Sequence, residues 1–472
     1  MKVYQSEKIK KKKAFMESVN QGMPVLLGLF LVQAAFLLYS CWRGKGEVFI
    51  RISLILIPLT LVTFGVVHLM KGDAYLVIWN ALLLNMGFLI QAVCQDLNEE
   101  GLSESIQKDI LKLCIAFALA YMAAIVFRFV SDWLSLEIMI PVFLLFQTGL
   151  MAALQFLGRE VGNADQKEQI AKIVMNLGGI DVQPMEFIKI IYVFVLGIIL
   201  CKNEYKDKRF LKLPREFWAA AYILFTAVPC ILLFNEGGSA LILLLTGIVM
   251  VLLFGDKREI VKLYVSIGSI LAGAACVLTL LLHDKYTLFE RVPVLNKLIL
   301  FLDKVYQRFY VLFSPEAGGQ NIQSQKAIAM GSLFGPSTNR YLVYVPRQEE
   351  DMIFSKLVGT TGIVIGIIAI GAIFLMFREG LVIARKNCDS YYKGLSIGFS
   401  LVLALEGAVH IACNLSLFPI TGIPLYFVSH GFSSMTGGMI MVAFLIVLSR
   451  GTQERSLYVE ETYYERIRNL RK

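Results

Sequence analysis

Residues 352–377, MIFSKLVGTTGIVIGIIAIGAIFLMF, form the stretch that decides the class of fold of this chain. Lys356 is the one charged residue among them. The hydrocarbon core of a bilayer is about 30 Å thick and needs roughly 20 apolar residues to cross it as a helix. The stretch therefore predicts a transmembrane span, which we assign to residues 354–377.

The same pattern recurs along the whole chain. Hydrophobic residues make up 57% of the 472 positions and charged residues only 17%, which is too apolar for a soluble globular protein. We predict an all-α polytopic membrane protein with about twelve transmembrane helices. The expected spans are residues 24–42, 52–70, 74–94, 110–130, 137–157, 186–201, 216–234, 238–254, 261–283, 354–377, 394–413 and 430–449.

Basic residues predict the orientation of these spans. Lysines crowd residues 8–13, and residues 202–215 are also basic, so both segments are expected on the cytoplasmic side. An even number of spans then places both termini inside. The acidic segment 95–109 falls outside, as do Arg43, Lys45 and Arg51, which break the rule. The net charge of +9 is thus a topology and lipid-surface signal, and we expect no nucleic-acid partner.

The domain organisation follows from the spans. We expect a cytoplasmic basic N-terminus at 1–23, a single transmembrane domain at 24–450 and a cytoplasmic tail at 451–472. Two outward segments are long, 158–184 and the large extracytoplasmic loop 284–351, and long loops often carry function. Within the second, residues 294–313 have the apolar spacing of an amphipathic helix in the outer membrane interface.

An acidic trio, Glu349, Glu350 and Asp351, stands directly before the apolar stretch. Charge at the mouth of a membrane span is costly to desolvate, so its presence indicates chemistry or binding.

Metal chemistry has less support. The eight cysteines form no C-x-x-C pair, and the four histidines lack the spacing of metal ligands. We therefore expect no protein metal site.

Three blocks of sequence, taken in order, resemble the SEDS family, which includes FtsW, RodA and SpoVE. The first block, QPMEFIK, is similar to the family's QPSEFAK. The second, IQSQKAIAMGSLFG followed by PRQEEDMIF, is similar to IQSxxAIGSGGLFG and PExHTDFIF. The third, PITGIPLYFVSHGFSS, is similar to PTTGLPLPFISYGGSS. The blocks occupy residues 183–189, 322–335, 346–354 and 419–434.

This resemblance implies a peptidoglycan glycosyltransferase that polymerises lipid II on the outer face of the bacterial cytoplasmic membrane, for division, elongation or sporulation. It also implies a ten-helix core, at about residues 74–450, to which two N-terminal helices are added. The expected partner is a class B penicillin-binding protein, the transpeptidase that crosslinks the strands. The family's essential acid falls on Asp351.

The chemistry of glycan polymerisation suits a single positioned carboxylate. An acceptor hydroxyl must lose its proton as it attacks an anomeric carbon that carries a polyprenyl diphosphate, and Asp351 is the expected base. Inversion at that carbon needs no covalent intermediate. A divalent cation, Mg²⁺ or Mn²⁺, on the diphosphate is compatible with this chemistry, although no motif in the sequence supplies its ligands.

The resemblance also implies substrate-binding residues. Glu186 and Lys189 match positions that line the central cavity, and Lys189 suits a diphosphate; because they are three residues apart, an intrahelical ion pair is the alternative. Arg308 either contacts a phosphate or extends from an interfacial helix into the headgroups. The remaining expected contacts are Gln323, Ser324, Glu350 and Ser433.

Departures from the family pattern leave two other functions open. Glu349 and Glu350 replace the family's His-Thr pair before the acid, Arg347 replaces a Glu, and His430 replaces a Tyr. A flippase of lipid-linked precursors would use the same intramembrane charges. A non-catalytic scaffold would keep the fold while its site changed. Retention of Asp351 favours the enzyme.

Overall fold

A computed structural model describes residues 2–70, 72–94, 102–161, 171–202, 215–255, 305–310, 319–336 and 345–449, with single residues or pairs between 265 and 303. Within these residues, eleven helices are long and apolar enough to cross a membrane. The prediction of an all-α polytopic membrane protein is confirmed. These helices are α1 (Lys2–Trp42), α2 (Gly46–Leu69), α3 (Tyr75–Cys94), α4 (Glu104–Leu134), α5 (Met139–Leu157), α6 (Pro184–Cys201), α8 (Arg215–Leu232), α9 (Gly237–Phe254), α14 (Ile363–Lys386), α15 (Ser390–Asn414) and a last helix, Phe432–Ser449.

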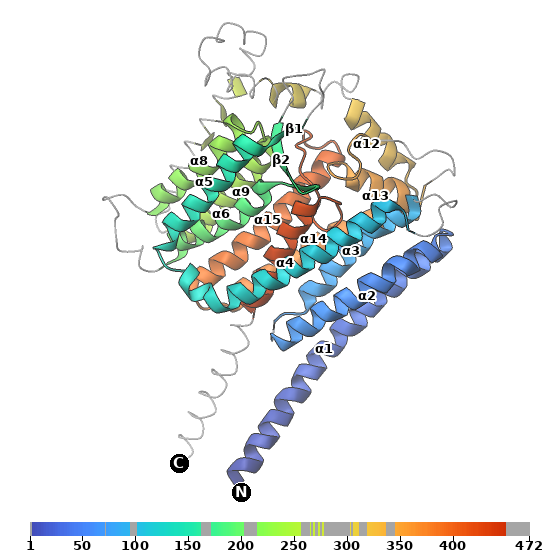
Figure 1. The fold of residues 1–472 in the computed structure, drawn as a ribbon, viewed down its shortest axis with the longest axis vertical. Helices are drawn as coiled ribbons and strands as arrows, with labels where there is room; N and C mark the ends of the chain where they lie inside the picture. The colour runs from blue at the N-terminus through green and yellow to red at the C-terminus, as the bar shows by residue number, and fades with distance from the viewer. Residues whose placement is uncertain are drawn as a thin grey trace.

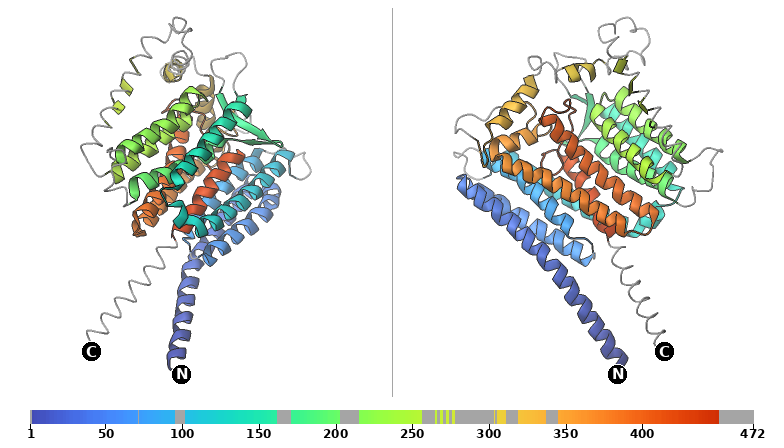
Figure 2. Two further views of the ribbon diagram at one scale, coloured as in Figure 1. Left: turned by 60° about the vertical axis from the view of Figure 1, so that its left-hand side comes forward. Right: turned by 180° about the vertical axis from the view of Figure 1, so that it is seen from behind.

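The eleven helices lie side by side as one bundle (Figure 1). α6 is buried along most of its length, as is the last helix, and apart from Glu186 and Lys189 it is apolar on every side. The α1–α2 hairpin packs along one flank against α3, which Figure 2 shows from two sides. Most of the predicted span 261–283 and of the predicted interfacial helix 294–313 falls outside the described residues, and so does the tail 451–472; residues 305–310 are helical.

Segment 158–184, predicted as an outward loop, contains a small antiparallel sheet. Its strands are β1 (Arg159–Val161), β2 (Ala171–Leu177) and β3 (Ile180–Val182), in the order β1-β2-β3. Gly178 and Gly179 join β2 to β3 with φ of 62° and 91°, the left-handed conformation that a two-residue hairpin turn requires. Figure 1 shows β1 and β2 at the end of the bundle opposite to the start of α1.

The predicted span 354–377 is wrong in its outline, because the helix breaks at Gly362. A short α13 (Ile353–Thr361) precedes the break and α14 follows it. The turn after α12 (Gly319–Met330) fills the break: Ile363 N donates to Ser332 O (2.9 Å) and Val364 N donates to Leu333 O (3.2 Å). These bonds satisfy amide groups at the start of α14 that have no partner within the helix. The residues around Asp351 are thereby carried by a separate short helix.

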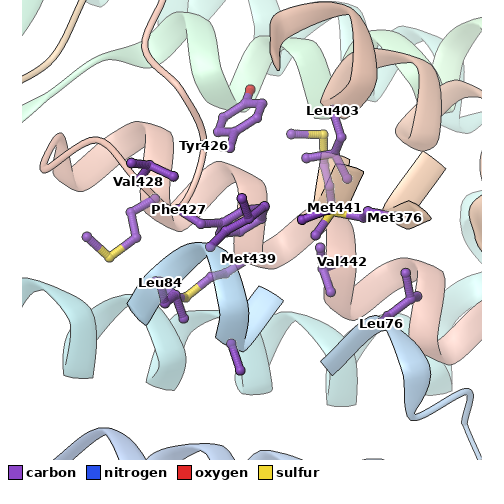
Figure 3. Packing of buried hydrophobic residues seen from close by; sticks show 14 of the residues in the cluster. Leu76, Leu84, Met376, Leu403, Tyr426, Phe427, Val428, Met439, Met441 and Val442 are labelled. Atoms are coloured by element: carbon purple, nitrogen blue, oxygen red, sulfur yellow. The ribbon is translucent and has the colours of Figure 1, made fainter. Parts of the chain in front are cut away.

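A non-helical segment, residues 415–431, enters the packed core between helices. Leu425, Tyr426, Phe427 and Val428 are almost completely buried there. Figure 3 shows Tyr426, Phe427 and Val428 among side chains of α3, α14, α15 and the last helix. Irregular backbone at membrane depth is tolerated only where protein encloses it. α3 allows this close approach at Gly87, where a Cβ would lie 2.7 Å from Val428 O.

The break at Gly362 yields a stability prediction. Gly362 has φ of 97°, and a Cβ there would lie 2.6 Å from Leu333 O and from Gly335 N. Gly362→Ala should therefore destabilise the protein by at least about 2 kcal/mol. Thermal unfolding in detergent measures the change. Gly65→Ala is the control, because no atom lies within 4 Å of its Cβ position; equal stability of both variants would contradict the strained break.

Candidate active site

Asp351 lies in a tight turn, residues 346–352, immediately before α13. The amides of Glu350 and Met352 both donate to Arg347 O, and Arg347 has a φ of 55°. The three acids of the turn differ in how far their side chains are exposed. The side chains of Glu349 and Glu350 are 63% and 43% exposed, whereas that of Asp351 is 6% exposed. The acidic trio is therefore one buried carboxylate beside two solvated ones.

Two arginines face the buried carboxylate. Arg347 Nε lies 2.9 Å from Asp351 Oδ2, and Arg308, in the helical residues 305–310, is close enough to interact with the same group. Burial raises the pKa of Asp351 to about 6, the two guanidinium groups oppose this rise, and Glu350 adds to it. An acid with this pKa is mostly ionised at neutral pH and still basic enough to accept a proton.

The backbone of the turn is held by Asn414 at the end of α15. Asn414 Nδ2 donates to Asp351 O (3.0 Å), and its Oδ1 accepts from Ser355 N (3.0 Å) and Ser355 Oγ (2.6 Å). Ser324 of α12 joins this network through Ser355 Oγ (2.5 Å) and Asn414 O (2.7 Å). Ser324 is fully buried, so in this structure it connects helices instead of facing a cavity.

Glu186 and Lys189 belong to a second, fully buried cluster. Lys189 Nζ lies 2.7 Å from Glu186 Oε1, the intrahelical pair considered from the sequence, and 2.8 Å from Glu406 Oε1 of α15. Tyr426 donates its hydroxyl proton to Glu186 Oε2 (2.7 Å). The Lys189 side chain is 1% exposed, so a diphosphate would reach its ammonium group only by displacing a carboxylate.

The other predicted contacts divide between the two regions. Glu350 pairs with Arg347 (3.0 Å) beside Asp351. Ser433 Oγ accepts from Gln183 N (2.8 Å), which ties the last helix to the start of α6. Gln323 Oε1 in α12 is buried and accepts no hydrogen bond. The structure thus brings Asp351, Glu350 and Arg308 together, while Glu186 and Lys189 form a cluster of their own.

Sequence reasoning missed Arg347, Glu406, Tyr426 and Asn414 as parts of these clusters. Glu406 had a usable signal, because it is an acid inside the predicted span 394–413, and intramembrane ionisable residues are functional candidates by default. Arg347 had a weaker one, the four-residue spacing to Asp351. Asp109, predicted in an outer loop, is in fact buried in α4, where it pairs with Lys112 (2.8 Å).

A divalent cation does not fit the described residues near Asp351. Within the part of the chain that the structure describes, no three His, Cys, Asp or Glu side chains are grouped to hold a metal ion. The Asp351 carboxylate is already paired with a guanidinium, which competes with a cation for the same oxygen atoms. We therefore derive the chemistry of the site from its side chains alone.

Comparison with known proteins relates this chain to a family. Residues 73–454 match the family model of the FtsW, RodA and SpoVE cell cycle proteins. A "Probable peptidoglycan glycosyltransferase FtsW" of Geobacter sp. (strain M18) is 28% identical over 279 residues, which cover 58% of this chain and 70% of that protein. Stage V sporulation protein E of Bacillus subtilis is 27% identical over 279 residues, with the same coverage of 58% and 70%.

Solved structures share the fold. The crystal structure of the rod shape determining protein RodA of Thermus thermophilus has a TM-score of 0.51 at 17% identity, covering 80% of this chain and 97% of that one. A chain from a peptidoglycan synthase complex has a TM-score of 0.58 at 19% identity, covering 81% and 98%. The α1–α2 hairpin lies before the residues that match the family model.

The pKa of Asp351 predicts a pH dependence. A base must be ionised to accept a proton, so kcat/KM for the reaction at this site should fall as the pH drops below about 6. The positive charge of Arg347 lowers the pKa of Asp351. Arg347→Gln should therefore move this fall of kcat/KM, the acid limb of the pH profile, to higher pH. Arg159→Gln, in β1, is the control and should leave the limb in place. An unmoved limb in Arg347→Gln would contradict the assignment.

The buried cluster predicts a stability difference between two substitutions. Lys189→Met leaves Glu186 and Glu406 buried without a cation and should destabilise the protein by about 3–5 kcal/mol. Glu406→Gln keeps one carboxylate for Lys189 and should cost less than about 1.5 kcal/mol. Thermal unfolding in detergent compares them, and equal stability would show that the ion cluster does not hold α6 to α15.

Proposed function

Because this chain belongs to the FtsW, RodA and SpoVE family of cell cycle proteins, we propose that it is a peptidoglycan glycosyltransferase that polymerises lipid II. One observation carries the proposal: a buried carboxylate, Asp351, with a raised pKa and two arginines beside it. The relatives named as peptidoglycan glycosyltransferases support the same activity.

Asp351 would act as the general base of the transfer. The acceptor sugar's hydroxyl oxygen attacks the anomeric carbon of the donor, and its proton passes to an Asp351 carboxylate oxygen. The bond between the anomeric carbon and the diphosphate oxygen breaks, and its electron pair leaves with the polyprenyl diphosphate. Gly422 favours access to the base, because the position of its absent Cβ lies 3.7 Å from Asp351 Oδ2, a space that a side chain would fill.

Arg308 is the residue that we assign to the leaving diphosphate. Its half-buried guanidinium is near Asp351, and burial lowers its pKa, so an anionic partner would stabilise it. Arg347 is a positioning residue, because its contacts with Asp351 and Glu350 fix the turn. Gln323 Oε1 has no hydrogen-bond partner among the described residues, but it is buried, so a sugar would reach it only after the side chain rotates. Glu186 and Lys189 would support the cavity by holding α6, α15 and the segment 415–431 together.

The membrane orientation and the partner belong to the same proposal. We assign Asp351 to the outer face of the cytoplasmic membrane, with both chain termini in the cytoplasm, from the distribution of basic residues. The structural similarity to a chain of a complex that coordinates polymerisation and crosslinking supports a class B penicillin-binding protein as the partner. Polymerisation and crosslinking would then take place side by side, since the transpeptidase consumes the strands made here.

Polymerisation of labelled lipid II in detergent tests the proposal. Asp351→Asn should lower the rate by at least about a hundredfold, the lower end of a general-base contribution, because the amide cannot accept the proton. Glu349→Gln is the matched control, since its side chain is largely exposed, and should keep most of the activity.

Detergent removes the bilayer, so a flippase would give no product in this assay. Product formation that survives Asp351→Asn would remove the assigned base. Lipid translocation in proteoliposomes without any polymerisation, in the presence of the transpeptidase, would instead favour the transporter.

A further inference from the structure

A group of cations lies at the outer-loop end of α1, α3 and α13, apart from Asp351. Arg43 and Lys45 follow α1, and Lys356 is in the first turn of α13. All three, together with the carboxylate of Glu349, act electrostatically on the side chain of Cys94, the last residue of α3, so they lie in the same region. Figures 1 and 2 show the end of α1 beside α13, although α1 and α13 are more than 300 residues apart in the chain. We call Arg43, Lys45 and Lys356 the cationic patch.

Arg43 is the residue of the patch whose charge has the fewest hydrogen-bond and ion-pair partners among the described residues. Its Nε is buried and makes no hydrogen bond, and none of the described side chains forms an ion pair with it. Its guanidinium lies against Gly335 in the turn after α12, where a Cβ would come within 2.8 Å of Nη1. Arg43 as a whole is half-buried, and its buried Nε–H without an acceptor costs free energy. The dipole of the preceding helix offsets only part of that cost.

The charge of Lys356 is also only weakly paired. Its side chain is 10% exposed, and its ion pair with Glu349 is long, at 3.7 Å. Glu349 is itself 63% exposed, so solvent weakens the pair further. Arg43 and Lys45 additionally stand on the side of the membrane where basic residues are disfavoured in our topology. Two poorly paired cations in one region indicate that an anion completes the patch.

We propose that the cationic patch binds the phosphate group of a membrane lipid whose chains lie in the outer leaflet. The patch lies at the ends of three helices of the membrane bundle, at the depth where headgroups stand. Guanidinium and ammonium groups together match phosphate oxygens. Arg43 and Lys45 precede the family-matched residues 73–454, so the site is a feature of the additional hairpin.

Two sources share this chemistry, an anionic phospholipid and a polyprenyl diphosphate. Only the second rests on the proposed function. In both cases the phosphate would compete with Glu349 for Lys356. Because the amide of His430 donates to Glu349 O (3.3 Å), the site is connected to the turn that carries Asp351.

Lipid retention by the full-length protein tests the site. Native mass spectrometry would measure binding of phosphatidylglycerol, of undecaprenyl diphosphate and, as a neutral reference, of phosphatidylcholine. Arg43→Gln and Lys356→Gln should each weaken retention of at least one anionic lipid by roughly fivefold to tenfold and leave phosphatidylcholine unchanged. Arg51→Gln is the matched control, because Arg51 already pairs with Glu47 (2.6 Å) in the same hairpin.

A second readout reports occupancy directly. Peptide-level alkylation of Cys94, which is half-buried in the patch, should slow several-fold when the retained lipid is added, and this protection should disappear in Arg43→Gln. If the patch variants retain less phosphatidylglycerol only, the patch is a phospholipid site. If they retain less undecaprenyl diphosphate, it is a substrate-lipid site, whether or not polymerisation is observed. Unchanged retention in both patch variants, or an equal loss in Arg51→Gln, would overturn the proposal and leave Arg43 as a packing contact of the turn.

Discussion

The hydrogen bonds of one side chain, Asn414, hold the site to the membrane bundle. Its amide contacts the Asp351 carbonyl and its oxygen accepts from Ser355, so one residue at the end of α15 fixes both the turn and the first residues of α13. Buried polar groups in a membrane protein need such partners, since no water replaces them. Asn414 fixes the backbone at Asp351, and the segment 415–431 holds the two preceding residues, because Ser429 Oγ donates to Glu350 O (3.1 Å) and His430 N donates to Glu349 O (3.3 Å).

The break at Gly362 is the second half of the same arrangement. A continuous helix would satisfy its own amides and leave no place for the turn after α12. Breaking the helix frees the amides of Ile363 and Val364 for Ser332 O and Leu333 O, and α12 then lies against α13. The left-handed φ of Gly362 is what permits this geometry. The short helix after Asp351 is thus fixed at both ends.

The two buried clusters differ in how their charged groups are paired. Asp351 is near the surface of the bundle and faces two arginines, so its pKa rises only to about 6. Lys189 is enclosed and faces two carboxylates, so its ammonium group is paired on both sides. The first arrangement leaves a titrating group for proton transfer. The second joins α6, α15 and the buried segment 415–431.

The sequence by itself determined the membrane class and the existence of eleven membrane-crossing helices among the described residues, although the helix predicted at 354–377 is shifted to Ile363–Lys386. The assignment of Asp351 as the essential acid stays a prediction. Length and apolarity sufficed for the spans, because the bilayer imposes both. Only the tertiary structure decided the break at Gly362, the burial of Asp351 beside Arg347, and the pairing of Lys189 with Glu406. Those features depend on contacts between residues as far as 217 positions apart, and no local period or spacing encodes such contacts.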